Sequence, residues 1–272
     1  MFLGGIMTTL TILDAIQSKE SFHKEVLDQK GLGLEVQDFT ELNLFYGNFS
    51  KTLSFYQGIR DQIQGPFALH GPFVDLKPYS FDQGIQAVSM FKYRMVLNMA
   101  SLLKADYVIF HSQINPFVQN KELWEIDRET NRKLFLDLLE EFDDFKGMIL
   151  LENIYEDHPD RLIKLVDHIN HPRVRVNLDI GHAGLSKKIS LREWIDLLGD
   201  RIQYCHFHWN NGDLDQHRRP SEEELGDLLS ILASSGLNVP LSLEYFPQDL
   251  GEDLARFKKV IAERSLPYEV SW

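Results

Sequence analysis

The sequence predicts an α/β fold, a single closed (β/α)8 TIM barrel with eight parallel strands. A short apolar stretch, a polar loop and a longer amphipathic helix recur eight times along the chain. No domain-sized linker interrupts this rhythm, so we expect residues 1–272 to form one domain. The length of 272 residues suits a closed barrel, which typically needs about 250. Polar residues that recur at the strand ends favour the barrel over its main rival, an open doubly wound sheet.

The apolar stretches place the strands, and the helical spacing of apolar residues places the helices between them. Strands are expected near residues 2–7, 32–39, 67–70, 107–111, 148–152, 174–179, 202–208 and 239–244. Helices are expected near residues 18–29, 50–64, 81–104, 134–145, 159–168, 191–198 and 252–264, with one more that begins at a capping box of Ser221 and Glu224. Strands that alternate with helices imply parallel pairing through right-handed crossovers.

Composition narrows the class of protein. The formal net charge is −13, which argues against broad contact with nucleic-acid phosphates. No apolar run approaches the roughly 20 residues that a membrane-spanning helix needs, so no membrane contact is expected. The one cysteine, Cys205, excludes an intrachain disulfide and fits a reducing cytoplasm, which is the expected location. The sequence leaves the oligomeric state open.

The sixth predicted strand ends on a carboxylate. Val174 and Val176 lie on one face and Asp179 on the other, and the chain then turns at Gly181 before His182. An Asp at a strand end and a His just after it could serve two neighbouring metal ions or one substrate. An ordinary turn with a chance histidine explains this stretch equally well when it is taken alone.

Other predicted strands end in the same kinds of residue. The nine candidate metal ligands are His70, His111, Glu152, Asp179, His182, His208, Asp215, His217 and Glu244. Active sites of such barrels lie at the carboxyl ends of the strands, and converging carboxylates would repel one another unless cations held them. Imidazole and carboxylate together suit Zn²⁺ or Mn²⁺. Because paired cysteines are missing, an open catalytic site is favoured over a closed structural zinc site.

These residues stand in motifs that resemble the xylose isomerase-like barrel superfamily, also called AP endonuclease family 2. The motifs are Leu69-His70-Gly71-Pro72-Phe73, Phe110-His111, Leu151-Glu152-Asn153, Asp179-Ile180-Gly181-His182, His208-Trp209-Asn210-Asn211, Asp215-Gln216-His217 and Leu243-Glu244. The metal residues are most similar to those of endonuclease IV, in which three zinc ions sit at the barrel mouth.

The resemblance implies a grouping of the ligands. His70 and His111 would hold one ion, with Glu152 bridging to a second. Asp179, His208 and Glu244 would complete the second, and the third would be held by His182, Asp215 and His217. The chain departs from endonuclease IV in three places: Gln216 replaces an arginine, the segment from His208 to Asp215 is shorter, and the loop at residues 39–47 lacks the basic and aromatic residues that press into DNA. DNA is therefore not expected to be the main substrate.

The sugar isomerases and epimerases of the same superfamily use a smaller site. One divalent ion is held there by two Glu, one Asp and one His, which Glu152, Asp179, His208 and Glu244 would supply. In the epimerases the two glutamates also exchange the substrate proton.

Two enzymatic hypotheses follow from the sequence. The first is a divalent-metal-dependent hydrolase with up to three Zn²⁺ ions that acts on a phosphoester, in the manner of an AP endonuclease. The alternative is a sugar or sugar-phosphate isomerase or epimerase with a single metal, with Glu152 and Glu244 as the acid/base pair. A barrel that only binds a metal or a sugar is the third hypothesis, and the open site makes it the least favoured.

Several other residues have two readings each. His206 could lie deeper in the barrel, behind the ligands, or be a ligand itself, and the deeper position is expected. Arg218 and Arg219 could clamp a phosphate or be solvated, and Trp209 and Phe73 could stack on substrate or pack the rim. Five further residues complete the expectations: Glu35 near the substrate, Cys205 buried toward the helices, and surface positions for His158, His168 and His171.

Overall fold

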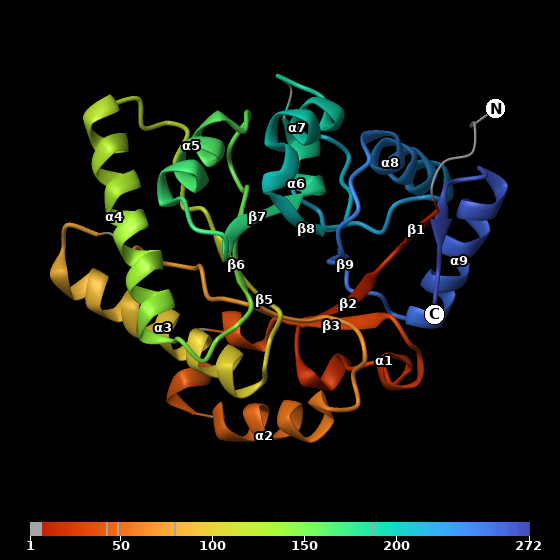
Figure 1. Ribbon diagram of the computed structural model, residues 1–272, viewed down its shortest axis with the longest axis horizontal. Coiled ribbons are helices and arrows are strands. Elements are labelled where there is room, and N and C mark those ends of the chain that lie inside the picture. Colours follow the sequence, from red (N-terminus) through yellow and green to blue (C-terminus); the bar gives the residue numbers. More distant parts are fainter. Residues whose placement is uncertain (1–6, 42, 48, 79, 187) are drawn as a thin grey trace.

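The computed structural model describes residues 7–41, 43–47, 49–78, 80–186 and 188–272, and eight parallel strands close into a barrel. Figure 1 looks into the barrel, with the helices arranged around it. The barrel strands are β2 (Ile12–Ile16), β3 (Leu32–Val36), β4 (Phe67–His70), β5 (Tyr107–His111), β6 (Met148–Glu152), β7 (Val174–Asp179), β8 (Ile202–His206) and β9 (Leu241–Leu243). The predicted fold class is confirmed.

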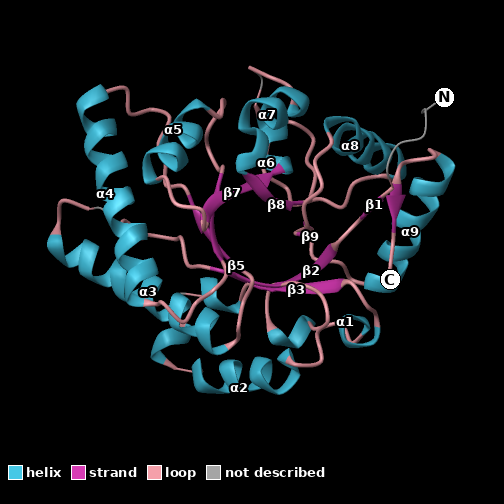
Figure 2. Cartoon of the chain, viewed as in Figure 1, coloured by secondary structure: helices cyan, strands magenta, loops and turns pink. Residues whose placement is uncertain are grey.

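Helices form the outer layer (Figure 2). They are α1 (Glu25–Asp28), α2 (Phe49–Arg60), α3 (Gln83–Leu102), α4 (Lys121–Glu141), α5 (Asp160–Ile169), α6 (Ile180–Leu185), α7 (Leu191–Leu198), α8 (Glu222–Ser235) and α9 (Leu250–Glu263). The capping box predicted for α8 is present: the Ser221 side chain accepts from the Glu224 backbone N–H, and the Glu224 side chain accepts from the Ser221 N–H. No described helix is long and apolar enough to cross a membrane.

The predicted elements differ from the observed ones chiefly at the N-terminal end of the chain and in α4, which begins at Lys121, well before Leu134, and ends at Glu141, before Phe145. The first barrel strand is β2, while the stretch predicted at residues 2–7 falls almost entirely outside the described residues. A two-residue strand, β1 (Thr8–Thr9), pairs instead with β10 (Tyr268–Glu269). In place of the helix predicted at 18–29 there are a 3-10 turn, η1 (Lys19–Ser21), and the single turn of α1. Short segments are the hardest to predict, because little periodicity fits within them.

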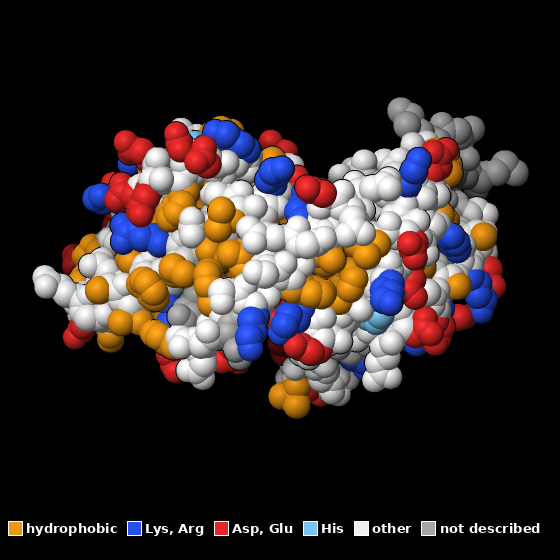
Figure 3. Space-filling model, turned by 90° about the horizontal axis from the view of Figure 1, so that it is seen from below, with side chains coloured by type: hydrophobic (Ala, Val, Ile, Leu, Met, Phe, Trp, Pro, Cys, Tyr) orange, Lys and Arg blue, Asp and Glu red, His pale blue; other side chains and the backbone are white. Residues whose placement is uncertain are grey.

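Two hydrophobic layers hold the barrel together. Inside it, Leu13, Ala68, Ile109, Leu150 and Tyr204 pack across the axis. Between strands and helices lies a larger cluster that includes Cys205, buried as predicted. Apolar groups also reach the surface: seen from the side of α2, they form a band between charged groups (Figure 3). Exposed apolar atoms are normal for a folded protein, so this band by itself assigns no site.

A register shift between β7 and β8 matters for the site. Val176 pairs with Ile202, but the next residue, Asn177, pairs with Tyr204. The extra residue on β8 moves the rest of that strand by one position, as in a β-bulge. As a result, Asp179 at the end of β7 lies level with His206 at the end of β8.

Candidate metal centre

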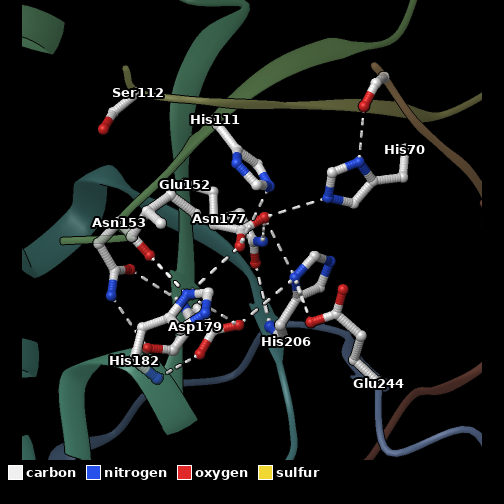
Figure 4. A network of polar contacts seen from close by, with 12 residues as sticks. His70, His111, Ser112, Glu152, Asn153, Asn177, Asp179, His182, His206 and Glu244 are labelled. Carbon is white, nitrogen blue, oxygen red and sulfur yellow. Dashed lines mark hydrogen bonds and ion pairs between the residues drawn. The ribbon is translucent and has the colours of Figure 1, made fainter. Parts of the chain in front are cut away.

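Three carboxylates and one imidazole converge where the strands end (Figure 4). Ligand atoms of Glu152, Asp179, His206 and Glu244 all lie within 4.8 Å of one another, and all four residues are buried. The first three end β6, β7 and β8, and Glu244 follows β9. Nδ1 of His206 lies 2.9 Å from Glu244 Oε2 and 3.2 Å from Glu152 Oε2. We call this cluster of four residues, including the histidine, the carboxylate group.

Two polar atoms of the carboxylate group lack hydrogen bonds. Among the described residues, His206 Nδ1 and Glu244 Oε2 are buried without a hydrogen-bond partner, although they lie 2.9 Å apart. A buried polar atom without a partner is costly. A divalent cation between these atoms would satisfy both, and three carboxylates with one imidazole form a ligand set that suits Zn²⁺ or Mn²⁺. The residues therefore fit a metal ion.

Glu35 orients the imidazole of this group. His206 Nε2 lies 3.1 Å from Glu35 Oε1, and the Tyr204 hydroxyl donates to Glu35 Oε2 at 2.7 Å. With Nε2–H donating to Glu35, Nδ1 is left to face the carboxylates, as is usual for a metal-bound histidine. Glu35 is fully buried inside the barrel, so the sequence-based placement of Glu35 beside the substrate is replaced by a place behind His206.

Charge in this group is balanced between imidazole and carboxylates. Burial alone would raise the pKa of Glu152, but His206 and His111 outweigh it, and the pKa lies well below its usual value. The pKa of Asp179 also lies well below its usual value, because nearby histidines, His182 foremost, outweigh the effect of burial. Burial lowers the pKa of His206, yet the carboxylates of Glu244, Glu35 and Glu152 raise it well above the ordinary value. The carboxylates of Glu152 and Asp179 are thus ionised and attract a cation.

Two asparagines fix the carboxylates. The Asn177 amide donates to Glu152 Oε2 at 3.2 Å, and its oxygen accepts from the His206 backbone N–H at 3.0 Å. Asn153 bonds both backbone groups of Asp179, at 2.9 Å and 3.0 Å. Such outer contacts hold metal ligands in place.

A second group of potential ligands lies beside the first and comprises His182, His208, Asp215 and His217. Nε2 of His182 and Nε2 of His217 each lie 3.1 Å from Asp215 Oδ2. Their Nδ1 atoms lie 2.9 Å and 3.0 Å from the backbone carbonyl oxygens of Asn153 and Glu244. Each ring is therefore held with Nε2 turned to Asp215. We call these four residues the histidine group.

Asp179 connects the two groups. His208 Nε2 lies 3.0 Å from both carboxylate oxygens of Asp179. The ring of His208 also stacks on that of His217, with centroids 4.0 Å apart and an interplanar angle of 3°. Gly181 makes this position available, because a Cβ there would lie 2.0 Å from His208 Cε1.

His70 and His111 lie on the other side of Glu152. His70 forms a third potential ligand set with Glu152 and His206, and its Nδ1 lies 2.8 Å from the Gly71 carbonyl oxygen. His111 Nε2 is 4.0 Å from Glu152 Oε1 and belongs to none of the sets found among the described residues. Burial lowers the pKa of His111 to about 3, so this ring is neutral.

All nine predicted residues thus gather at one end of the barrel, but they group differently than expected. The imidazole that joins Glu152, Asp179 and Glu244 is His206, whereas His208 joins the histidine group. His206 was expected behind the ligands. Period-2 alternation correctly places both histidines on the inner face, but it does not reveal which of them lies level with Asp179.

The remaining predicted residues have structural contacts. Arg218 pairs with Glu224 through two hydrogen bonds, of 2.7 Å and 2.8 Å, and Arg219 pairs with Asp253 and Glu252, so neither guanidinium is poised to clamp a phosphate. Phe73 stacks on His111 with ring centroids 4.0 Å apart. The backbone of Trp209 forms an isolated antiparallel β-bridge with that of Arg218. His158, His168 and His171 lie partly exposed, outside both groups.

Comparison with known proteins agrees with this architecture. A family model described as xylose isomerase-like TIM barrel matches residues 57–260. The chain belongs to this family. The uncharacterized protein MJ1311 of Methanocaldococcus jannaschii is 25% identical over 203 residues, which are 71% of this chain and 69% of that protein.

Solved structures share the fold. A D-tagatose 3-epimerase-like protein has a TM-score of 0.69 at 20% identity, covering 94% of this chain and 100% of its own. The TTHB071 protein of Thermus thermophilus, soaked with ZnCl2, has a TM-score of 0.70 at 18% identity, covering 93% of this chain and 99% of its own. At these identities the likeness establishes the barrel architecture.

Proposed function

We propose that the protein is a sugar or sugar-phosphate isomerase or epimerase that uses one divalent metal ion in the carboxylate group. The observation that carries the proposal is the convergence of two Glu, one Asp and one His within 4.8 Å, with two of their buried atoms lacking hydrogen bonds. The shared fold with a D-tagatose 3-epimerase-like protein supports it. The sequence favoured phosphoester hydrolysis and gave this sugar chemistry as the alternative, with His208 rather than His206 among the ligands. The likeness to the epimerase-like protein favours the alternative.

Glu152, Asp179, His206 and Glu244 would hold the ion. When bound, it would supply Lewis-acid polarisation of a substrate carbonyl. Glu152 and Glu244 are the acid/base pair of the proposal: one carboxylate removes the proton on the carbon next to the carbonyl, and the other returns a proton. The two residues come from β6 and from the end of β9, three strands apart around the barrel. Because the two carboxylates approach that carbon from two sides, its configuration can be inverted.

His70 and His111 complete the sugar site in this proposal. Neutral imidazoles can donate and accept hydrogen bonds, and His111 is neutral at physiological pH because its pKa is about 3. Phe73 stacks on His111 and holds its ring in place. These residues would contact sugar hydroxyls rather than the ion.

The test is a screen of ketoses and ketose phosphates with the Mn²⁺- and the Zn²⁺-loaded protein, in which the sugars formed as products are measured. Glu152→Gln and Glu244→Gln should each reduce turnover at least about 100-fold, which is the size of contribution expected from a general acid or base. Glu141→Gln, on the exposed end of α4, is the matched control and should retain full turnover. Turnover that survives in both site variants would rule out the proposed acid/base pair.

Hydrolysis of a phosphoester is the second candidate, and the histidine group is the observation that favours it. Four further ligands beside the first centre could hold additional Zn²⁺ ions, and neighbouring ions can activate water and stabilise phosphoryl oxygens. His217→Ala should abolish such a hydrolase but only weaken a one-metal isomerase. Full phosphodiesterase activity in His217→Ala would exclude a mechanism that needs this group.

A further inference from the structure

A cavity of about 700 Å³ lies beside the metal centre, between the segments that follow β5 and β6 and the first turns of α4 and α5. This volume falls within the range of small-molecule binding sites. None of the nine candidate metal ligands lines it. The proposed sugar chemistry therefore leaves the cavity without a role.

Aromatic side chains form one wall of the cavity. Trp124, Phe117 and Tyr155 line it, and Phe117 and Tyr155 are 88% and 74% exposed. Leu76 and Ile114 add aliphatic surface. Large aromatic groups left this exposed beside a cavity offer stacking surfaces to a planar ligand.

The cavity is positively charged, although the chain carries a net charge of −13. Five cationic side chains and only two carboxylates line it. The cationic residues are Lys77, Lys121, Arg128, Arg161 and Lys164, and the acidic residues are Glu125 and Asp127.

Two lysines supply the accessible charge. Glu125 pairs with Arg128, whereas in the described part of the chain Lys121 and Lys164 have no carboxylate within ion-pair distance. Lys121 is the first residue of α4, where the helix dipole adds positive potential, and Lys164 lies one turn into α5. The cavity therefore favours an anion.

Arg161 holds the cavity open rather than binding within it. Its guanidinium donates to the carbonyl oxygens of Asn115 at 2.7 Å and Val118 at 3.0 Å. It also stacks on the Trp124 indole, 3.6 Å from the ring centroid. These contacts fix the loop after β5 against α4 and α5, so the aromatic wall is formed before a ligand arrives.

Short chain segments join the cavity to the metal centre. Ser112 lines the cavity and directly follows His111, and its backbone N–H donates to the Glu152 carbonyl oxygen at 3.0 Å. Figure 4 shows Ser112 beyond His111, on the side away from His206. Tyr155 lines the cavity three residues after Glu152. Buried Glu156 ties these segments together by accepting from the Ser112 hydroxyl at 2.6 Å. A ligand in the cavity would thus lie next to a group held at the metal centre.

We propose that this cavity binds an aromatic anion, as the part of the substrate that extends away from the reacting sugar. The position of the reacting part at the metal centre rests on the proposed function. The cavity's own preference for an aromatic ring with a phosphate, carboxylate or sulfonate rests on Phe117, Tyr155, Lys121 and Lys164.

Naphthalene-2-sulfonate is a suitable probe, because a sulfonate is a weak metal ligand. Calorimetric titration of the metal-loaded protein should give one site for this anion, with at least tenfold weaker binding of neutral 2-naphthalenemethanol and of inorganic sulfate. The double variant Lys121→Glu/Lys164→Glu should weaken probe binding at least tenfold. Lys30→Glu, an exposed position before β3, is the matched control and should bind as the unmodified protein does.

Equal binding of the neutral alcohol, or unchanged binding in the double variant, would overturn the proposal. A kinetic comparison then tests the link to the substrate. The double variant should raise KM at least tenfold for a ketose that carries an aryl phosphate, with kcat unchanged, and leave KM for a simple ketohexose unchanged. Because the titration needs no turnover, lack of isomerase activity would count against the proposed function and not against the cavity as an aromatic-anion site.

Discussion

The Glu35 carboxylate lies 3.1 Å from Nε2 of His206 and sets which nitrogen of that ring faces the metal-binding carboxylates. Glu35 is fully buried and also accepts from the Tyr204 hydroxyl. This contact turns Nδ1 toward Glu152 and Glu244. A residue at the end of β3 thereby controls a ligand at the end of β8.

Glu35→Gln should weaken metal binding without removing a ligand. An amide oxygen can still accept from Nε2–H, but the negative charge that raises the basicity of the imidazole is lost. Loss of such outer contacts typically costs about 10- to 100-fold in metal affinity, which competition with a fluorescent chelator measures. Glu41→Gln, an exposed glutamate shortly after β3, should bind metal like the unmodified protein, and unchanged affinity in Glu35→Gln would refute the orienting role.

His206 and His208 should differ sharply when each is replaced by alanine. His206→Ala removes the imidazole of the carboxylate group and should abolish its metal binding and the proposed isomerase activity. His208→Ala should leave metal in the carboxylate group and reduce activity far less, because His208 reaches that group only through Asp179. Metal content per chain and ketose turnover should be measured for both variants. A larger loss in His208→Ala than in His206→Ala would support the ligand grouping expected from sequence, in which His208 joins Glu152, Asp179 and Glu244.

Metal binding to the histidine group should release protons. Burial lowers the pKa of His217, but Asp215 and the carboxylates of Glu244 and Asp179 raise it to about 9. Because a metal binds the neutral imidazole, apparent affinity should rise with pH up to about 9 and then level off. Calorimetry at pH 7 in two buffers with different ionisation enthalpies counts the protons, and a count of zero would contradict this account.

The ionisation of His217 also affects the stability of the metal-free protein, in a direction that its pKa determines. A folded-state pKa above the ordinary value of 6.5 means that the folded state binds the proton more tightly than the unfolded chain. The resulting stabilisation is fully present below about pH 6.5 and is lost as the pH rises through about 9. Removing the imidazole in His217→Ala should diminish this part of the pH dependence in chemical unfolding experiments.

Tyr204→Phe should destabilise the barrel interior. The Tyr204 hydroxyl is the buried donor to Glu35 Oε2, and its loss would remove a hydrogen bond to a buried charge. We expect a loss of about 1–3 kcal/mol in the free energy of unfolding, measured by urea denaturation. Tyr107→Phe, a partly exposed neighbour of Tyr204 in the barrel, should cost much less, and equal losses would show that the contact with Glu35 contributes little.

The sequence predicts most of the barrel and the end at which its chemistry lies. Glu152 and Asp179 stand at strand ends with clear apolar runs before them, so their place is predictable from period-2 alternation. The pairing of His206 with Asp179 depends on an extra residue in β8, and the alignment of neighbouring strands leaves no trace in a single strand's pattern. Glu35 could not be assigned its role for the same reason, since its partner lies 171 residues away.

Solvent exchange tests the central claim most directly. The Mn²⁺- or Zn²⁺-loaded protein should be incubated with ketoses in D₂O, and deuterium on the carbon next to the carbonyl should be followed by NMR. We predict incorporation that is lost in Glu152→Gln and Glu244→Gln and retained in His217→Ala. Absence of incorporation from every ketose, together with phosphodiester hydrolysis that requires His217, would contradict the one-metal sugar chemistry.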